Sequence, residues 1–329
     1  MKNIFKLLAF LPLLTACDDL FEPALENNRD LEAMHKEPSY AQGILANAYI
    51  ILPYETSPTS DLATDDAVTN EISSNYLRMA TGSWTANNNP VSQWQNRFNA
   101  ILYINLFLEN VDKVEWAKDE RISTMFLDRL KGEAYGLRAL HMYYLLRAHG
   151  GKIADGTLMG VPIILKSEGP DADFNHARAT YSDCVKQIME DAGKAIELLP
   201  LDYKKFADSE IPEKYRNIGV TNASDYRRVC GEEYRGLMSG RIALAVRAQT
   251  ALLAASPAFQ GGSGMTWEQA ADYAAEIIEK ANGGGGCGLD ADGLEWYTLA
   301  DKDYGTGGSP AEVIWRSSTD AVSYTHLRA

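Results

Sequence analysis

Residues 132–151 decide the fold: G-E-A-Y-G-L-R-A-L-H-M-Y-Y-L-L-R-A-H-G-G. The stretch contains no proline, and its leucine, alanine and arginine residues favour helix. Apolar residues recur at steps of three and four, the spacing of one helix face. That face comprises Phe126, Leu130, Ala134, Leu137, His141, Tyr144 and Ala148, and a second comprises Tyr135, Ala139, Met142, Tyr143 and Leu146. A helix with two apolar faces is predicted to lie buried among its neighbours.

The boundaries of this helix also follow from the sequence. It is expected to run from about Asp119 to Ala148. The pair Gly150-Gly151 ends it, because glycine readily adopts the left-handed conformation found at helix C-termini. His141 and His149 have no acidic partner at helical spacing, so both are predicted to be structural.

Further helices are predicted from the same spacing over residues 39–52, 91–112, 181–199, 239–255 and 266–281. Thr180 and Thr266 stand at capping-box positions, three residues before Asp183 and Gln269. Trp94 shares an apolar face with Phe98 and is predicted to belong to the core. The order of these helices predicts a mainly α fold of tetratricopeptide-like helical pairs with long irregular loops. No clean repeat of about 34 residues is visible.

Several segments interrupt the helical pattern. Residues 53–90 are rich in Ser, Thr, Asn and Asp, which is loop composition, and a connection this long is usually functional or disordered. Residues 202–233 are charged and interrupted by proline, so they are predicted to be a surface excursion. The apolar run 160–165 contains a proline and is predicted to be extended. Residues 312–315 are predicted to form a strand.

Charge and cysteine content exclude some classes of function. The formal net charge of −14 argues against a nucleic-acid partner, whose phosphates attract basic surfaces. Cys184, Cys230 and Cys287 are widely spaced, and no histidine stands at metal-ligand spacing from them. Neither a zinc site nor a disulfide framework is predicted, and no cofactor is expected. Cys184 lies within a helical pattern and is expected to be buried.

The N-terminus has the features of a secretory signal. Lys2 and Lys6 precede the apolar run 7–14, which is too short to span a bilayer. The signal ends in Leu14-Thr15-Ala16-Cys17, which resembles the bacterial lipobox. That resemblance implies that residues 1–16 are removed and that the acylated Cys17 anchors the chain in lipid. The alternative is an ordinary signal with a chance cysteine.

Residues 17–38 are polar and charged without sustained periodicity, and they are predicted to be an acidic tether. The acidic pair after the cysteine, Asp18-Asp19, resembles the surface-export signal of Bacteroidetes lipoproteins. The alternative is a solvated tether with no such role.

The sequence as a whole resembles the SusD/RagB family of Bacteroidetes outer-membrane nutrient-binding lipoproteins. The stretches that carry the resemblance are the lipobox with its acidic followers, Trp94 with Tyr103-Ile104-Asn105, residues 133–162, and residues 181–200 with the helix 241–255. They cover nearly all of residues 17–318 and imply a SusD-like helical domain at 39–321 that lacks its C-terminal part. Residues 322–329 resemble a translated sequencing-adapter tail and are expected to be non-native.

The resemblance implies a surface-exposed, lipid-anchored protein of the outer membrane that performs no catalysis. Members capture a nutrient, usually an oligosaccharide and less often a peptide, for a SusC-like TonB-dependent transporter. One alternative is a lipid-anchored tetratricopeptide-like scaffold that binds only proteins or peptides. Another is a lipoprotein glycosidase. The sequence argues against a glycosidase, because Glu190-Asp191 and Glu232-Glu233 are adjacent pairs. The side chains of adjacent residues point different ways and do not flank one bond.

A sugar site needs exposed aromatic rings for the apolar faces of sugars, and polar side chains for their hydroxyl groups. Outside the helices, residues 53–90 supply this mixture. The first candidates are Trp84, Asn87, Asn88 and Asn89, and the second are Tyr76, Arg78, Asp65 and Asp66. The resemblance supports this region without aligning individual residues. The alternative is that Trp84 anchors the loop by packing on the scaffold. Trp296 and Tyr297 are expected to pack in a turn.

Overall fold

The computed structural model describes residues 31–53, 60–85, 88–89, 91–281 and 313–315. The α-helices in these ranges are α2 (Leu31–Lys36), α3 (Pro38–Ile50), α4 (Asn75–Ala80), α5 (Trp94–Asn110), α6 (Glu120–His149), α7 (Tyr181–Leu198), α8 (Glu213–Arg216), α9 (Ala223–Cys230), α10 (Gly240–Ala255), α11 (Gln260–Ser263) and α12 (Trp267–Ala281). The strands β1 (Gly151–Lys152) and β2 (Leu158–Met159) pair antiparallel. The prediction of a mainly α fold is confirmed.

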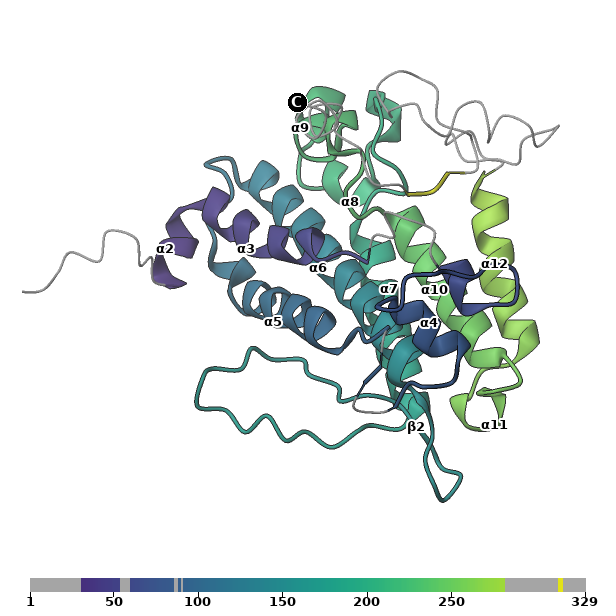
Figure 1. The fold of residues 1–329 in the computed structure, drawn as a ribbon. Coiled ribbons are helices and arrows are strands. Elements are labelled where there is room, and N and C mark those ends of the chain that lie inside the picture. Colours follow the sequence, from purple (N-terminus) through teal and green to yellow (C-terminus); the bar gives the residue numbers. More distant parts are fainter. Residues whose placement is uncertain (1–30, 54–59, 86–87, 90, 282–312, 316–329) are drawn as a thin grey trace, which may run out of the picture.

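The helices pack side by side in a series, with α6 near its middle. The contacts run from α3 to α5, from α5 to α6, from α6 to α7, from α7 to α10, and from α10 to α12. Figure 1 shows the same succession, with α6 passing through the middle of the molecule. Both predicted apolar faces of α6 contribute buried residues, including Leu137 on one face and Met142 on the other. The prediction that this helix is buried among its neighbours is therefore confirmed.

The two ends of α6 have different explanations. Asp119 caps the N-terminus, because its side chain accepts from the backbone N–H of Arg121 at 2.9 Å. At the C-terminus, the expectation of a left-handed glycine is wrong: Gly150 has φ −75° and ψ 149°, which is extended. A side chain does not fit there, since a Cβ on Gly150 would lie 2.6 Å from the Leu146 carbonyl oxygen and 2.9 Å from the Tyr181 ring.

The other helix starts agree with the sequence. Thr180 caps α7 by accepting from the backbone N–H of Asp183 at 3.1 Å. The Ser239 side chain accepts from Ile242 at the start of α10. Thr266 and Gln269 form a reciprocal capping box before α12, with bonds of 3.0 and 3.2 Å. Cys184 is buried, as predicted.

The predicted surface excursion at 202–233 is wrong. This segment contains α8 and α9 and builds a second apolar cluster against α6. The cluster comprises Ile211, Tyr215, Val220, Tyr226, Val229 and Cys230 from the segment, with Ile122 and Met125 from α6. Two of its members, Tyr215 and Tyr226, are tyrosines, which do not give an apolar periodicity in a charged sequence.

Two shorter segments also differ from expectation. The helix α2 lies within the predicted tether, and its Met34 is fully buried. Residues 313–315, the described part of the predicted strand at 312–315, have no strand assignment. There the Trp315 indole N–H donates to the Gly236 carbonyl at 2.8 Å. The predicted signal peptide, Cys17, Trp296, Tyr297 and the tail at 322–329 lie outside the described residues.

A buried polar network joins three helices to the segment after β2. The Arg138 guanidinium of α6 donates to both carboxylate oxygens of Asp191 on α7, at 2.7 and 2.8 Å. It also donates to Asn105 Oδ1 of α5 at 2.9 Å. The Asn105 amide donates in turn to the carbonyls of Ile164 and Lys166, at 3.0 Å each. One guanidinium therefore fixes the relative positions of α5, α6, α7 and residues 164–166.

We expect Asp191→Asn to destabilise the fold by about 3 to 5 kcal/mol, because it leaves the Arg138 cation buried without its counter-charge. The matched control is the neighbouring Glu190→Gln. Glu190 pairs with Lys194 at 2.7 Å on the surface, and loss of such a pair costs about 0.3 to 0.5 kcal/mol. Urea unfolding followed by circular dichroism measures both. Equal effects of the two substitutions would contradict the role given to Arg138.

His141 is buried on α6 and structural, as predicted. The Arg97 guanidinium donates to its Nδ1 at 3.1 Å, and its Nε2–H donates to the Ala48 carbonyl at 3.1 Å. Arg97 has no acceptor, so this geometry requires a neutral ring protonated on Nε2. Burial, together with the nearby Arg97 charge, lowers the pKa of His141 to about 3.

This depressed pKa predicts a loss of stability in acid. An unfolded histidine takes up its proton near pH 6.5, whereas folded His141 resists protonation down to about pH 3. The contribution of His141 to the free energy of unfolding is complete above pH 6.5. It falls by up to about 1.4 kcal/mol per pH unit as the pH decreases from 6.5 to about 3. Urea titrations at pH 7, 6 and 5 should show that the free energy of unfolding decreases as the pH is lowered. His141→Gln should reduce this dependence on pH. An unchanged slope in that variant would disprove the prediction.

Candidate functional site

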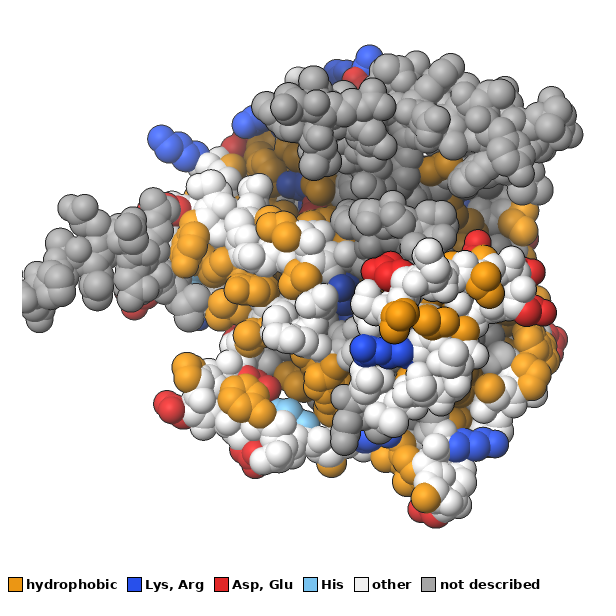
Figure 2. All heavy atoms as spheres, viewed as in Figure 1, with side chains coloured by type: hydrophobic (Ala, Val, Ile, Leu, Met, Phe, Trp, Pro, Cys, Tyr) orange, Lys and Arg blue, Asp and Glu red, His pale blue; other side chains and the backbone are white. Residues whose placement is uncertain are grey.

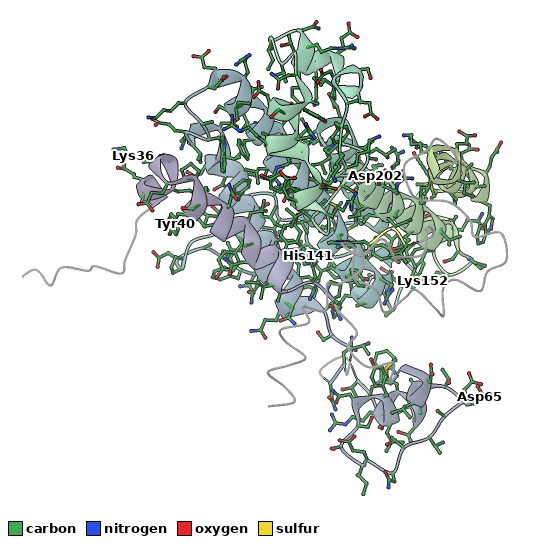
Figure 3. The ribbon with its side chains drawn as sticks, turned by 90° about the horizontal axis from the view of Figure 1, so that it is seen from above. Lys36, Tyr40, Asp65, His141, Lys152 and Asp202 are labelled. Carbon is green, nitrogen blue, oxygen red and sulfur yellow. The ribbon has the colours of Figure 1, made fainter. Side chains whose placement is uncertain are left out.

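The sequence-predicted sugar site lies on a projecting segment, residues 60–85 and 88–89. This segment contains α4 and the 3-10 helix η2 (Ser60–Ala63), which pack on each other. Figure 3 shows it, with Asp65 labelled, as a lobe set apart from the body that contains His141. In Figure 2, apolar, basic and acidic side chains lie side by side where Figure 1 places α4. The segment offers an accessible and chemically mixed surface.

Three of the predicted residues belong to one small unit of this segment. The Trp84 side chain is 50% exposed. Thr85 and Asn88 form an antiparallel bridge directly after it. The Arg78 guanidinium on α4 donates to Asn88 Oδ1 at 3.2 Å, which ties the bridge to the helix. An exposed indole, a guanidinium and an amide thus belong to one small unit, and they are the mixture expected for a sugar site.

The remaining predicted residues are less closely connected. The Asn89 side chain accepts from the Val91 backbone N–H at 3.0 Å, which is a local turn contact. Tyr76 is half-buried on α4. Asp65 and Asp66 are exposed, and no contact in the described part of the segment joins them to Trp84. Asn87 lies outside the described residues.

A second candidate surface lies along α5. A groove of about 230 Å³ separates this helix from the chain after β2, and we call it the α5 groove. Its apolar lining comprises Trp94, Phe98, Ile101, Leu102, Pro162, Ile164 and Phe174. Figure 2 shows apolar and histidine side chains between α5 and the loop that follows β2. Sequence reasoning missed this groove.

Trp94 corrects a prediction, because it is 43% exposed and does not belong to the core. It is the first residue of α5, and the next two residues, Gln95 and Asn96, are also exposed. The inward face of α5 becomes buried only from Arg97 onward. The sequence signal for this exposure was a tryptophan at the first position of a helix, directly after a polar loop. The helical spacing between Trp94 and Phe98 led to the core prediction instead.

The Trp94 ring is held in a fixed orientation. It meets Phe98 edge-to-face at 4.8 Å between centroids and His149 at 5.4 Å. The Nε2 atom of His149 accepts from the Gln93 backbone N–H at 3.0 Å, which fixes the imidazole against the start of α5. Burial, with a smaller effect of the Arg178 charge, lowers the pKa of His149, so this acceptor stays unprotonated at neutral pH.

The opposite wall of the groove is held by α5 itself. Asn105 fixes the backbone at Ile164 and Lys166, and Glu109 accepts from the Ser167 backbone N–H at 2.8 Å. At the end of this wall, His176 Nε2 lies 2.6 Å from Glu168 Oε1. The groove therefore has two walls that are positioned before any ligand arrives.

Comparison with known proteins gives the family. A family model described as starch-binding and associating with the outer membrane matches residues 25–214, more than half of the chain. The chain belongs to the SusD-like family. Among proteins of curated function, none matches the sequence.

Solved SusD-like structures share the fold. A SusD-like protein of Bacteroides fragilis is 16% identical, with a TM-score of 0.62 over 91% of this chain and 48% of its own. A SusD superfamily protein of Bacteroides vulgatus is 20% identical, with a TM-score of 0.56 over 80% and 51%. A laminarin-binding SusD-like protein is 18% identical, with a TM-score of 0.55 over 82% and 50%. This chain thus spans about half the length of these relatives.

SusD-like proteins bind carbohydrate and are not catalytic. In this chain, three of the four carboxylates considered above for glycoside hydrolysis lie against basic side chains. Glu190 pairs with Lys194, and Asp191 pairs with Arg138. Glu232 lies 3.2 Å from Lys205. In the described ranges, no three His, Cys, Asp or Glu residues gather as a metal site would require. None of the helices described is both long and apolar enough to cross a membrane.

A further hollow of about 260 Å³ lies between α3 and the chain around Tyr234. Its polar groups contact one another: Arg129 donates to Glu133 at 2.8 Å, and the Tyr49 hydroxyl donates to the same carboxylate at 2.7 Å. The guanidinium also lies 4.0 Å from the Tyr234 ring centroid. Burial raises the pKa of Glu133, and the Arg129 charge opposes that shift. We interpret this cluster as structural.

Proposed function

We propose that this SusD-like protein binds a glycan at the cell surface through its projecting segment. The observation that carries the proposal is the half-exposed Trp84 beside Arg78 and Asn88, in a chain whose family model is described as starch-binding. An indole presents an apolar face to a sugar ring. The guanidinium and amide next to it supply donors and an acceptor for hydroxyl groups.

Preorganisation supports this site. The bond between Arg78 and Asn88 and the bridge between Thr85 and Asn88 restrict the loop that carries Trp84. The Ser83 backbone N–H also donates to the Arg78 carbonyl at 2.9 Å. A loop that is already ordered loses less conformational entropy when a ligand binds.

A second candidate function, binding of a protein or peptide, is favoured by one feature of the same segment. Val68 is 91% exposed and Ile72 is 90% exposed. Where exposed apolar side chains gather into one patch, they suit contact with another protein. The two functions differ in which side chains the ligand needs.

We expect Trp84→Ala to weaken glycan binding at least about tenfold, or about 1.4 kcal/mol, because it removes the stacking face. Affinity electrophoresis and calorimetry measure this with starch, laminarin, xylan and mannan as probes. The control is Trp267→Ala, which removes another exposed tryptophan, on α12.

The outcomes separate the candidates. Binding that Trp84→Ala leaves unchanged would contradict the site. Binding of peptides but no glycan, with loss on Val68→Ser or Ile72→Ser, would favour the second function. Release of reducing sugar by the purified protein would contradict a purely binding role.

The proposal includes an anchor and a partner. The lipobox supports acylation of Cys17, hence attachment to the outer membrane, and the family description names an association with that membrane. A SusC-like TonB-dependent transporter would receive the bound glycan. Its association is tested by co-purification with a tagged transporter encoded beside this gene.

We expect cells given a radiolabelled fatty acid to incorporate the label into this protein, because acylation adds hydrocarbon chains at Cys17. Cys17→Ser should abolish both the label and the membrane fraction of the protein. Label that persists in this variant would exclude Cys17 as the acylated residue. Protease treatment of intact cells then tests exposure at the surface.

A further inference from the structure

We propose that the α5 groove is a second carbohydrate site, which binds one sugar ring and is distinct from the projecting segment. This inference rests on the proposed glycan-binding function and extends it to residues that the sequence did not indicate. The central side chain is Trp94, with Phe174 and Lys166 on the opposite wall.

Exposure is the first argument. Phe174 is 62% exposed and Trp94 is 43% exposed, and both line the same hollow. Leu102, at 37%, continues the apolar surface along α5. Large apolar side chains gathered around a hollow mark a site that something contacts, because their exposure is unfavourable in water.

The shape of the groove limits the ligand. Its volume of about 230 Å³ is somewhat below the range of about 300 to 1,000 Å³ for pockets that hold whole small molecules. One ring of a longer glycan fits such a space, with the rest of the chain outside. Both walls are fixed by hydrogen bonds to α5 or next to it, so the groove exists before binding.

The chemistry of the groove favours a sugar. Both rings that contact Trp94 meet it edge-to-face, and in the described part of the chain no ring lies parallel to the indole. An apolar sugar face can therefore stack on it. The polar residues that line the same groove are Asn99, Lys166, Glu168 and His176.

These polar groups are available for hydroxyl groups. Across the described ranges, neither the Lys166 ammonium nor the Asn99 amide has a side-chain partner. Glu168 and His176 are paired with each other at 2.6 Å, yet a carboxylate has acceptor capacity for further donors. A purely apolar peptide segment would leave these groups without a role.

The position of the groove allows one glycan to reach both sites. Trp84 and Trp94 are ten residues apart, which limits their Cα separation to about 35 Å even in a fully extended chain. Longer oligosaccharides should therefore depend on Trp94 more than short ones do, because only they extend from one site to the other.

The test uses the full chain and an oligosaccharide series of increasing length, prepared from whichever of starch, laminarin, xylan and mannan the protein binds. Calorimetry should show that Trp94→Ala weakens binding of the longest members about tenfold, and Trp94→Phe less. Phe174→Ala and Lys166→Met should each weaken it severalfold. Both residues lie on the loop side of the groove, so these variants test the site even if Trp94→Ala fails to fold. Trp267→Ala is the matched control.

The results separate this inference from the proposed function. Loss of binding with Trp84→Ala, but not with any groove variant, would overturn the groove and leave the function intact. Absence of glycan binding by the wild-type protein would overturn both. An apolar peptide whose binding is lost in Trp94→Ala, together with unchanged glycan binding in that variant, would reassign the groove to a protein partner.

Discussion

The rest of the structure depends on the buried guanidinium of Arg138. A cation in the interior is stable only if its charge and donors are matched, and here two carboxylate oxygens of Asp191 and the Asn105 oxygen provide that match. Each partner lies on a different helix. The requirement to satisfy one side chain therefore fixes the relative positions of α5, α6 and α7, which apolar packing alone would leave less exactly defined.

The same network extends from the core to the surface. Asn105 can accept from Arg138 and donate to Ile164 and Lys166, because an amide has both an acceptor and donors. Its two donated bonds satisfy carbonyl groups of a segment that has no strand partner there. The irregular chain after β2 thus becomes a fixed wall for the α5 groove. A scaffold interaction and a candidate binding surface are parts of one chain of hydrogen bonds.

The sequence predicted what depends on local chemistry. The caps at Thr180 and Thr266 need only neighbouring residues, and both were correct. The core prediction for Trp94 was wrong. Periodicity shows which helix face a residue shares, but the burial of its side chain depends on where the core ends. The prediction of a surface excursion at 202–233 was wrong because the tyrosines of this segment are buried in a cluster with Ile122 and Met125, which are remote in the sequence. Local patterns do not contain such long-range contacts.

The candidate sites show the same limit. Composition indicated the projecting segment as a candidate, since a tryptophan among amides and charges is visible in the sequence, whereas the exposure of Trp84 is a finding of the structure. The bond from Arg78 to Asn88, which orders that segment, is a property of the folded chain. The α5 groove needs even more distant partners, because Trp94 faces residues from beyond α6. A candidate surface built from one loop can therefore be proposed from composition, whereas a candidate surface built between a helix and a remote loop requires the fold.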